Sequence, residues 1–227
     1  MTTTTYATAA ELRTQINKSV STGTATDAAL LLILQAASDA IDRECNRPDG
    51  LIADSVATVR TYSGSGKTFM LIDECVSITT VAVKDSPTDT AYVTWASTDW
   101  IPFSGDAERP NYNQLPYTGV LIDPTGDYDI FTSGYFSTMR GFRPVTSYGR
   151  GVPTVQITAR WGYSTTVPPI IKQATLAQAA QWLKRGEAAW ADTVATAELG
   201  PAPYMTLSRE IKAMITDARL IRPSLAF

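Results

Sequence analysis

The stretch Thr154-Val155-Gln156-Ile157-Thr158-Ala159-Arg160-Trp161 alternates apolar and polar side chains and is followed by Gly162-Tyr163 and the pair Pro168-Pro169. Alternation with a period of two residues is typical of a half-buried β-strand. The two prolines preset backbone angles that suit the first turn of a helix. The chain that follows is rich in alanine as far as residue 190 and carries two adjacent apolar stripes at helical spacing. We therefore predict a closing strand that leads into a long helix, on which the rest of the chain packs.

Three further helices are predicted from apolar periodicity and from capping signals. The first spans residues 7–18, where Thr8 and Glu11 form a capping box. The second spans residues 27–47 and the last spans residues 206–219, with its first residue, a threonine, as the N-cap. The apolar stripe of the second helix consists of Leu30, Ile33, Leu34, Ala37, Ile41 and Cys45.

From residue 53 to residue 160 the sequence changes to short segments rich in β-branched and aromatic residues, separated by turn residues. Besides the closing strand, the predicted strands are 58–62, 69–72, 76–83, 91–95, 99–103 and 119–122. The predicted fold class is α+β, a helical bundle with an inserted antiparallel β domain. Its expected parts are an N-terminal helical part (1–50), the β domain (51–163), the long helix with its loop (164–204), and a C-terminal helix with a tail (205–227).

The composition excludes several classes of function. The 227 residues are 44% apolar and 18% charged, which is typical of a folded soluble protein. A net charge of −3 argues against a protein that grips nucleic acid by charge neutralisation. The chain has no histidine, the commonest general base and metal ligand. Its two cysteines, Cys45 and Cys75, are too few for a zinc site, and we interpret them as reduced rather than disulfide-bonded.

Targeting signals are not found in this sequence. Residues 1–6 have neither the basic start nor the apolar core of a signal peptide. The longest apolar run, residues 28–34, is too short to span a bilayer. We expect a protein that is made in the cytoplasm and has no membrane partner.

Two segments resemble functional motifs but fail in their spacing. Gly64-Ser65-Gly66-Lys67-Thr68 resembles the end of a phosphate-binding loop, yet position 61 is threonine where that motif requires glycine, and a strand is predicted after it. We interpret this segment as a hairpin turn. Asp123, Asp127 and Asp129 lack the spacing of a calcium loop, and we interpret them as part of a turn. With no catalytic motif, we predict a protein that is not an enzyme and uses no cofactor or metal.

Surplus apolar surface marks candidate interfaces on two of the predicted helices. Leu31 and Leu32 lie off the apolar stripe of the second helix, and they pack either on the first helix or against another subunit. Alanine-rich faces on the long helix let backbones approach closely, which suits a second helix or an adjacent subunit. The candidate oligomer-interface residues are therefore Leu31, Leu32, Ala174, Ala177 and Trp182.

Two other segments each have two open interpretations. The run from residue 135 to residue 151 contains Arg140, Arg143 and Arg150, and it is either a solvated hairpin tip or a loop that meets an acidic partner or lies near a DNA path. The apolar C-terminal residues 220–227 either fray or form a docking strand for another protein.

An alternative function comes from the aromatic residues of the β domain, which suggest a carbohydrate-binding module. Such a module stacks sugar rings on an exposed aromatic platform. In strands, however, aromatic residues are more typical of the core or of cross-strand pairs. The candidate platform residues are Tyr92, Trp95, Trp100, Tyr112, Tyr117, Tyr128, Tyr135 and Phe136.

The order of these segments resembles that of the head-to-tail connector (adaptor) proteins of tailed bacteriophages, in their larger, β-containing form. The resemblance begins with Tyr6-Ala7-Thr8 and Glu11-Leu12, followed by Ala37-Ser38-Asp39-Ala40-Ile41-Asp42 and Cys45-Asn46-Arg47. It continues with the strands at 58–62 and 100–102 and with Pro110 and Leu115. Ala159-Arg160-Trp161-Gly162-Tyr163, which leads into Val167-Pro168-Pro169 and the alanine helix, completes it.

The resemblance implies a structural virion protein of the neck, at the head-tail interface. Such proteins form rings, commonly of twelve copies, beneath the portal protein, and DNA passes through the ring without specific binding. A tail or stopper protein attaches on the other side. The C-terminal segment commonly contacts the portal, which makes Met214, Ile221, Leu225 and Phe227 the expected docking residues. The runner-up is a stopper-like neck or tail-completion protein.

Overall fold

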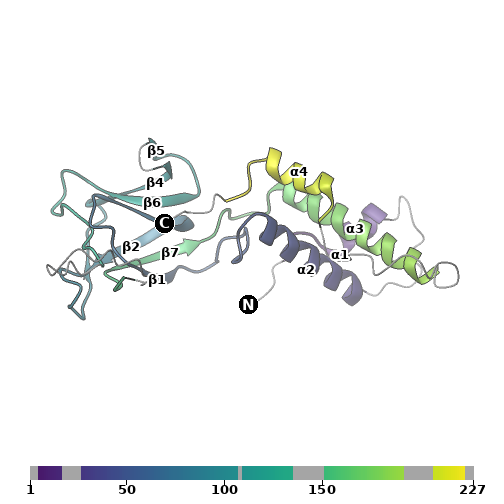
Figure 1. Cartoon of the computed structure of the whole chain (residues 1–227), viewed down its shortest axis with the longest axis horizontal. Coiled ribbons are helices and arrows are strands. Elements are labelled where there is room, and N and C mark those ends of the chain that lie inside the picture. Colours follow the sequence, from purple (N-terminus) through teal and green to yellow (C-terminus); the bar gives the residue numbers. More distant parts are fainter. Residues whose placement is uncertain (1–4, 17–26, 107–108, 135–150, 192–206, 223–227) are drawn as a thin grey trace, which may run out of the picture. The chain divides into compact units, whose positions relative to one another are not determined.

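The computed structural model describes residues 5–16, 27–106, 109–134, 151–191 and 207–222. The chain divides into two compact units, a helical unit from residues 1–51 and 166–227 and a β unit from residues 52–165. The helices lie in the first unit and an antiparallel sheet lies in the second (Figure 1). The predicted α+β class, with a β insertion between helices, is therefore confirmed.

The helical unit contains α1 (Ala9–Ile16), α2 (Asp27–Glu44), α3 (Pro169–Ala191) and α4 (Arg209–Asp217). The predicted capping box at the start of α1 is present. Thr8 Oγ1 accepts from the Glu11 amide at 3.2 Å, and Glu11 Oε2 accepts from the Thr8 amide at 2.9 Å. The predicted cap of the last helix is wrong, because Ser208 caps α4 and accepts from the Ile211 amide.

Apolar packing and ion pairs hold the helices together. The described core of α1, α2 and α3 consists of Leu12, Ile16, Leu30, Leu34, Ala37 and Ala179, with Ala7 from the N-terminal segment. Three ion pairs join different helices at their rims: Arg13–Asp27 at 2.7 Å, Glu11–Lys172 at 2.8 Å and Glu44–Lys212 at 3.0 Å. The apolar stripe of α2 is thus a core stripe, as its periodicity predicts.

The β unit contains β1 (Thr58–Tyr62), β2 (Phe69–Val83), β3 (Val93–Thr94), β4 (Trp100–Asp106), β5 (Arg109–Asn111), β6 (Tyr117–Ile122) and β7 (Val155–Trp161). The sheet order is β1-β7-β2-β6-β4-β5, and β3 pairs with β2. Every described pair of named strands is antiparallel. The closing strand therefore sits inside the sheet, between β1 and β2.

Two local predictions about strands are wrong. The segments 69–72 and 76–83 form one strand, β2, whose pairing with β6 and β7 shifts register around Cys75. The segment from Gly64 to Thr68 is not a hairpin turn, because β1 and β2 both pair with β7 and not with each other. It is a loop that crosses from one side of β7 to the other.

The core of the β unit lies on one face of this sheet. Val155, Ile157, Ala159 and Trp161 alternate with half-buried residues along β7 and are all buried, as the opening stretch predicts. Trp161 Nε1 donates to the Thr58 carbonyl at 2.9 Å, so even its polar atom is satisfied. Gly162 ends the strand at φ 135°, and a Cβ there would lie 2.4 Å from Ala53 Cα.

Candidate assembly surfaces

Two adjacent leucines of α2 point away from the helical core. Leu31 is 42% exposed and Leu32 is 67% exposed, whereas Leu30 and Leu34 are buried. Of the two interpretations open from the sequence, packing on the first helix does not fit this exposure. Burial of a leucine side chain stabilises a protein or a complex by about 1.5–3 kcal/mol. An exposed pair of leucines therefore indicates a surface that a partner covers.

The candidate interface residues of α3 differ among themselves. Ala174 is fully buried inside the helical unit, so we assign it to internal packing and no longer to a subunit interface. Ala177 is half-buried. Trp182 is also half-buried and packs against the helical core, and its indole Nε1 has no hydrogen-bond partner within the described residues.

The predicted docking residues lie at and beyond the end of α4. Met214 is half-buried on α4, and Ile221 is exposed just after the helix. Leu225 and Phe227 lie outside the described residues, as do Arg140, Arg143 and Arg150. Leu220, immediately before Ile221, is buried, so the chain is held against the helical unit up to this point.

A further apolar surface, absent from the residues predicted from the sequence, lies on the β unit. Phe69 pairs with Leu121, and Leu121 pairs with Ile101; Leu71 pairs with Gly119. Paired residues share a face of the sheet, and the alternate residues Met70 and Val120 belong to the core on the opposite face. We call Phe69, Leu71, Ile101 and Leu121 the outer apolar face. Leu71 is exposed and the other three are half-buried.

The signal for this outer apolar face is visible in the strand sequences themselves. Phe69-Met70-Leu71-Ile72 and Val120-Leu121-Ile122 are unbroken apolar runs, whereas β7 alternates. An unbroken run predicts a strand that is covered on both faces. Along β7 the outer positions are Gln156, Thr158 and Arg160, which are polar, so the outer apolar face does not extend across this strand.

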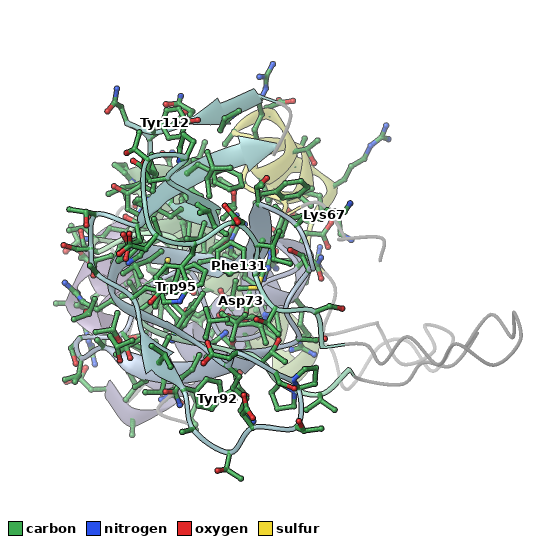
Figure 2. The ribbon with its side chains drawn as sticks, turned by 90° about the vertical axis from the view of Figure 1, so that its left-hand side faces the viewer. Lys67, Asp73, Tyr92, Trp95, Tyr112 and Phe131 are labelled. Atoms are coloured by element: carbon green, nitrogen blue, oxygen red, sulfur yellow. The ribbon has the colours of Figure 1, made fainter. Side chains whose placement is uncertain are left out.

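Of the six described aromatic residues of the suggested sugar platform, Trp95 and Trp100 belong to the core, and Tyr117 and Tyr128 pack half-buried against it. Trp95 is 5% exposed and stacks on Tyr128, with ring centroids 4.2 Å apart, and on Phe131, at 5.2 Å. Trp100 is also buried. Figure 2 shows Tyr92 and Tyr112 at opposite ends of the β unit, so they do not form one platform. Tyr135 and Phe136 lie outside the described residues.

The motif-like segments have structural explanations. Lys67 Nζ lies 5.4 Å from the centroid of the Phe69 ring, and the strand β2, not a helix, follows it. The Asp123 carboxylate accepts from the amide and hydroxyl of Thr125, at 2.8 and 2.6 Å, which forms a turn. Among the described residues no group of three or more histidine, cysteine, aspartate or glutamate side chains could hold a metal ion.

Both cysteines are free and fully buried, in agreement with the reduced state predicted from the sequence. Burial raises the pKa of the Cys75 thiol to about 12, which keeps it protonated and unreactive. None of the helices in the described part of the chain is long and apolar enough to cross a membrane.

Comparison with known proteins adds a likeness in fold. A chain from the virion of a native gene transfer agent particle gives a TM-score of 0.50 at 17% sequence identity, over 94% of this chain and 89% of that chain. The two chains share a fold. A chain from the neck of an empty gene transfer agent particle, computed with C6 symmetry, gives a TM-score of 0.48 at 15% identity, over 91% of this chain and 87% of that chain. No protein-family model and no curated protein matches the sequence.

Proposed function

We propose that this chain is a structural, non-enzymatic subunit of a virion neck, a connector that forms a ring beneath the portal. Two independent lines support the proposal. The segment order resembles that of head-to-tail connectors, and the fold is shared with a chain from a gene transfer agent virion over 94% of the present chain. Location in the virion neck and a ring of about twelve copies follow from the resemblance and belong to this proposal.

The observation that carries the proposal is the exposed leucine pair of α2. Leu32 is the most exposed leucine among the described residues, and Leu31 lies beside it. A subunit that works by assembly needs apolar surface that its own fold leaves uncovered. In the proposed ring, Leu31 and Leu32 pack against the neighbouring copy, with Ala177 and Trp182 of α3 as further interface residues.

Different surfaces would then serve different partners. The C-terminal residues, with Met214, Ile221, Leu225 and Phe227, would dock on the portal. The outer apolar face of the β unit would bind the tail or stopper protein. The loop with Arg140, Arg143 and Arg150 would meet an acidic partner or lie near the DNA path. With a net charge of −3, the ring would let DNA pass without gripping it.

The test is native mass spectrometry with negative-stain imaging over a concentration series of the purified chain. We expect closed rings with a central hole, either from the chain alone or after addition of the portal protein. Leu32→Glu should weaken assembly by about tenfold or more, because it places a charge in an apolar contact. The matched control is Gln15→Glu, which adds the same charge at an exposed position of α1 and should assemble normally.

A chain that stays monomeric with and without the portal contradicts the connector assignment. Binding to a tail protein but not to the portal would favour the stopper-like protein instead. Equal assembly by Leu32→Glu and the wild type would show that the α2 leucines are not the interface.

A further inference from the structure

Helices α2 and α4 end in the same way. Each is closed by a left-handed residue, Asn46 at φ 56° and Arg219 at φ 54°. After α2, the Arg47 amide donates to the Asp42 carbonyl at 2.9 Å, and after α4 the Leu220 amide donates to the Ile215 carbonyl at 3.2 Å. These are the six-to-one hydrogen bonds of the Schellman motif, which reverses the chain at a helix C-terminus.

The two helix ends are joined to each other. The Arg222 amide donates to the Cys45 carbonyl at 2.9 Å, and the Asn46 side-chain amide donates back to the Arg222 carbonyl at 3.3 Å. The Arg47 guanidinium donates both to the Cys45 carbonyl, at 3.3 Å, and to the Leu220 carbonyl. Residues 220–222 are therefore held against the end of α2.

Electrostatics explains why an arginine occupies this junction. The C-terminus of an α-helix carries a partial negative charge of about half an electron, so two such ends repel when they meet. Arg47 is 5% exposed and places a permanent positive charge on carbonyls from both ends. A neutral side chain would leave the two helix ends uncompensated and the Leu220 carbonyl without this donor.

We propose that Arg47 is a positioning residue that fixes the root of the C-terminal tail, residues 223–227, for docking on the portal. The inference rests on the proposed function, in which this tail is the docking segment. The tail follows directly from Arg222, whose amide and carbonyl are both bonded at the junction. Because residues 220–222 are already fixed at the junction, docking need not order them, and ordering one residue costs about 1–2 kcal/mol.

Arg47→Met tests this role, because it keeps an unbranched apolar stem in place of the arginine stem and removes the charge and the donors. We expect the affinity of the full chain for the purified portal, measured by biolayer interferometry, to fall by about tenfold or more. Assembly of the variant, measured by native mass spectrometry, should stay at the wild-type level. The Arg222 amide should exchange faster with deuterium. The matched control is Arg43→Met, on the last turn of α2, which should bind the portal as the wild type does.

A milder variant covers the case in which Arg47→Met fails to fold. Asn46→Gly keeps the left-handed backbone without strain and removes only the amide bonded to Arg222. It should also speed exchange at Arg222 and weaken portal binding, by less than the arginine change. Faster exchange at Arg222 together with wild-type portal affinity in either folded variant overturns the inference. Equal losses of assembly and of portal affinity would show a general structural role and overturn it too.

A chain that ends at Arg222 separates this inference from the proposed function. It lacks Leu225 and Phe227 but keeps the junction, so it should assemble and bind the portal about tenfold or more weakly than the full chain. If it binds the portal as well as the full chain does, docking by the tail is wrong, whatever the arginine variants do.

Discussion

The two units differ in how many polar side chains they bury: among the described residues these are Ser38, Arg47, Thr175 and Gln178 in the helical unit, and Asp99 and Thr154 in the β unit. In the β unit the described core is one apolar cluster that contains Trp95, Phe131 and Ile157. In the helical unit the apolar core is accompanied by buried polar groups that tie segments together: Tyr6 before α1, Arg47 after α2, and Gln178 within α3, which accepts from the amide of the α4 cap residue. The difference indicates that burial of apolar surface is the main stabilisation of the β unit. In the helical unit, hydrogen bonds also fix the positions of the chain termini and of the connections.

This difference matters for an assembly protein because its partners meet termini and exposed faces, not cores. The free energy gained by burying apolar surface does not depend on pH. The strength of a buried hydrogen bond to a carboxylate does, because the carboxylate can take up a proton. The helical unit should therefore respond more strongly to single polar changes and to pH than the β unit, in which loss of packing should have the largest effect.

Trp95→Ala should have the largest effect, with a loss of about 3–5 kcal/mol from the stability of the β unit. The substitution removes an indole that stacks on both Tyr128 and Phe131 and leaves a cavity. Urea unfolding followed by tryptophan fluorescence and circular dichroism measures it, and the loss should be the same at pH 5 and pH 8. Tyr112→Ala, at an exposed position, is the control and should change stability by no more than about 0.5 kcal/mol. A loss that depends strongly on pH contradicts the proposed division between the units.

Tyr6→Phe should have an intermediate effect in the helical unit. The Tyr6 hydroxyl donates to the Asp42 carboxylate and accepts from the Leu51 amide at 2.9 Å, so it joins the N-terminal segment, α2 and the chain that leaves the helical unit. Its removal leaves a buried amide without this acceptor, which costs about 1–3 kcal/mol. The helical signal at 222 nm should report the loss during urea unfolding. No measurable loss would show that water replaces the hydroxyl and that this contact does not position Leu51.

The sequence predicts the features that are local. The capping box of Thr8 and Glu11 and the alternation of β7 each depend on a few neighbouring residues, and both are present. The cap of α4 was misplaced because two hydroxyl residues stand two positions apart there. The pairing of β1 and β2 with β7 was not predicted because β7 lies far along the chain. The residues around Gly64 do not show that a distant strand lies between β1 and β2.

Candidate surfaces were predicted less well because periodicity shows which residues are apolar and not what covers them. Leu32 and Ala174 look equally available in the sequence, yet the first is exposed and the second is fully buried. In the sequence Arg47 is simply the last residue of the predicted second helix, and its bond to the Leu220 carbonyl follows from tertiary structure alone. The outer apolar face was readable from unbroken apolar runs in β2 and β6.

The pH dependence of the helical unit should come from two carboxylates, those of Asp42 and Glu11. Burial raises the pKa of Asp42 from 3.8 to about 6, so the folded state takes up this proton more readily than the unfolded state does. Stability from this group therefore rises as pH falls from about 7 towards 4. The hydrogen bond from Lys172 lowers the pKa of Glu11 from 4.5 to about 2, so stability from Glu11 is lost as pH falls below about 4.5.

Together the two groups place the optimum for the helical unit at about pH 4 to 4.5, because stability from Asp42 still rises down to about pH 4 and stability from Glu11 is lost below about pH 4.5. Asp42→Asn should remove the rise between pH 7 and pH 5 and leave the acid limb unchanged. Urea midpoints of the helical signal, measured from pH 3 to pH 8, test both parts. A variant that keeps the full slope between pH 7 and pH 5 would assign that slope to another group.

Arg13→Ala should have the smallest effect. The ion pair between Arg13 and Asp27 is 2.7 Å long, but the side chains are 35% and 78% exposed. Water and salt screen such a pair, and its loss costs about 0.2–1 kcal/mol at low ionic strength and less in 0.5 M salt. Gln15→Ala, on the same helix, is the control for side-chain truncation at an exposed site. A loss well above 1 kcal/mol, unchanged by salt, would mean that surface charges hold α1 in place. Such a result would contradict the idea that buried polar contacts hold the helical unit together, in contrast to the apolar core of the β unit.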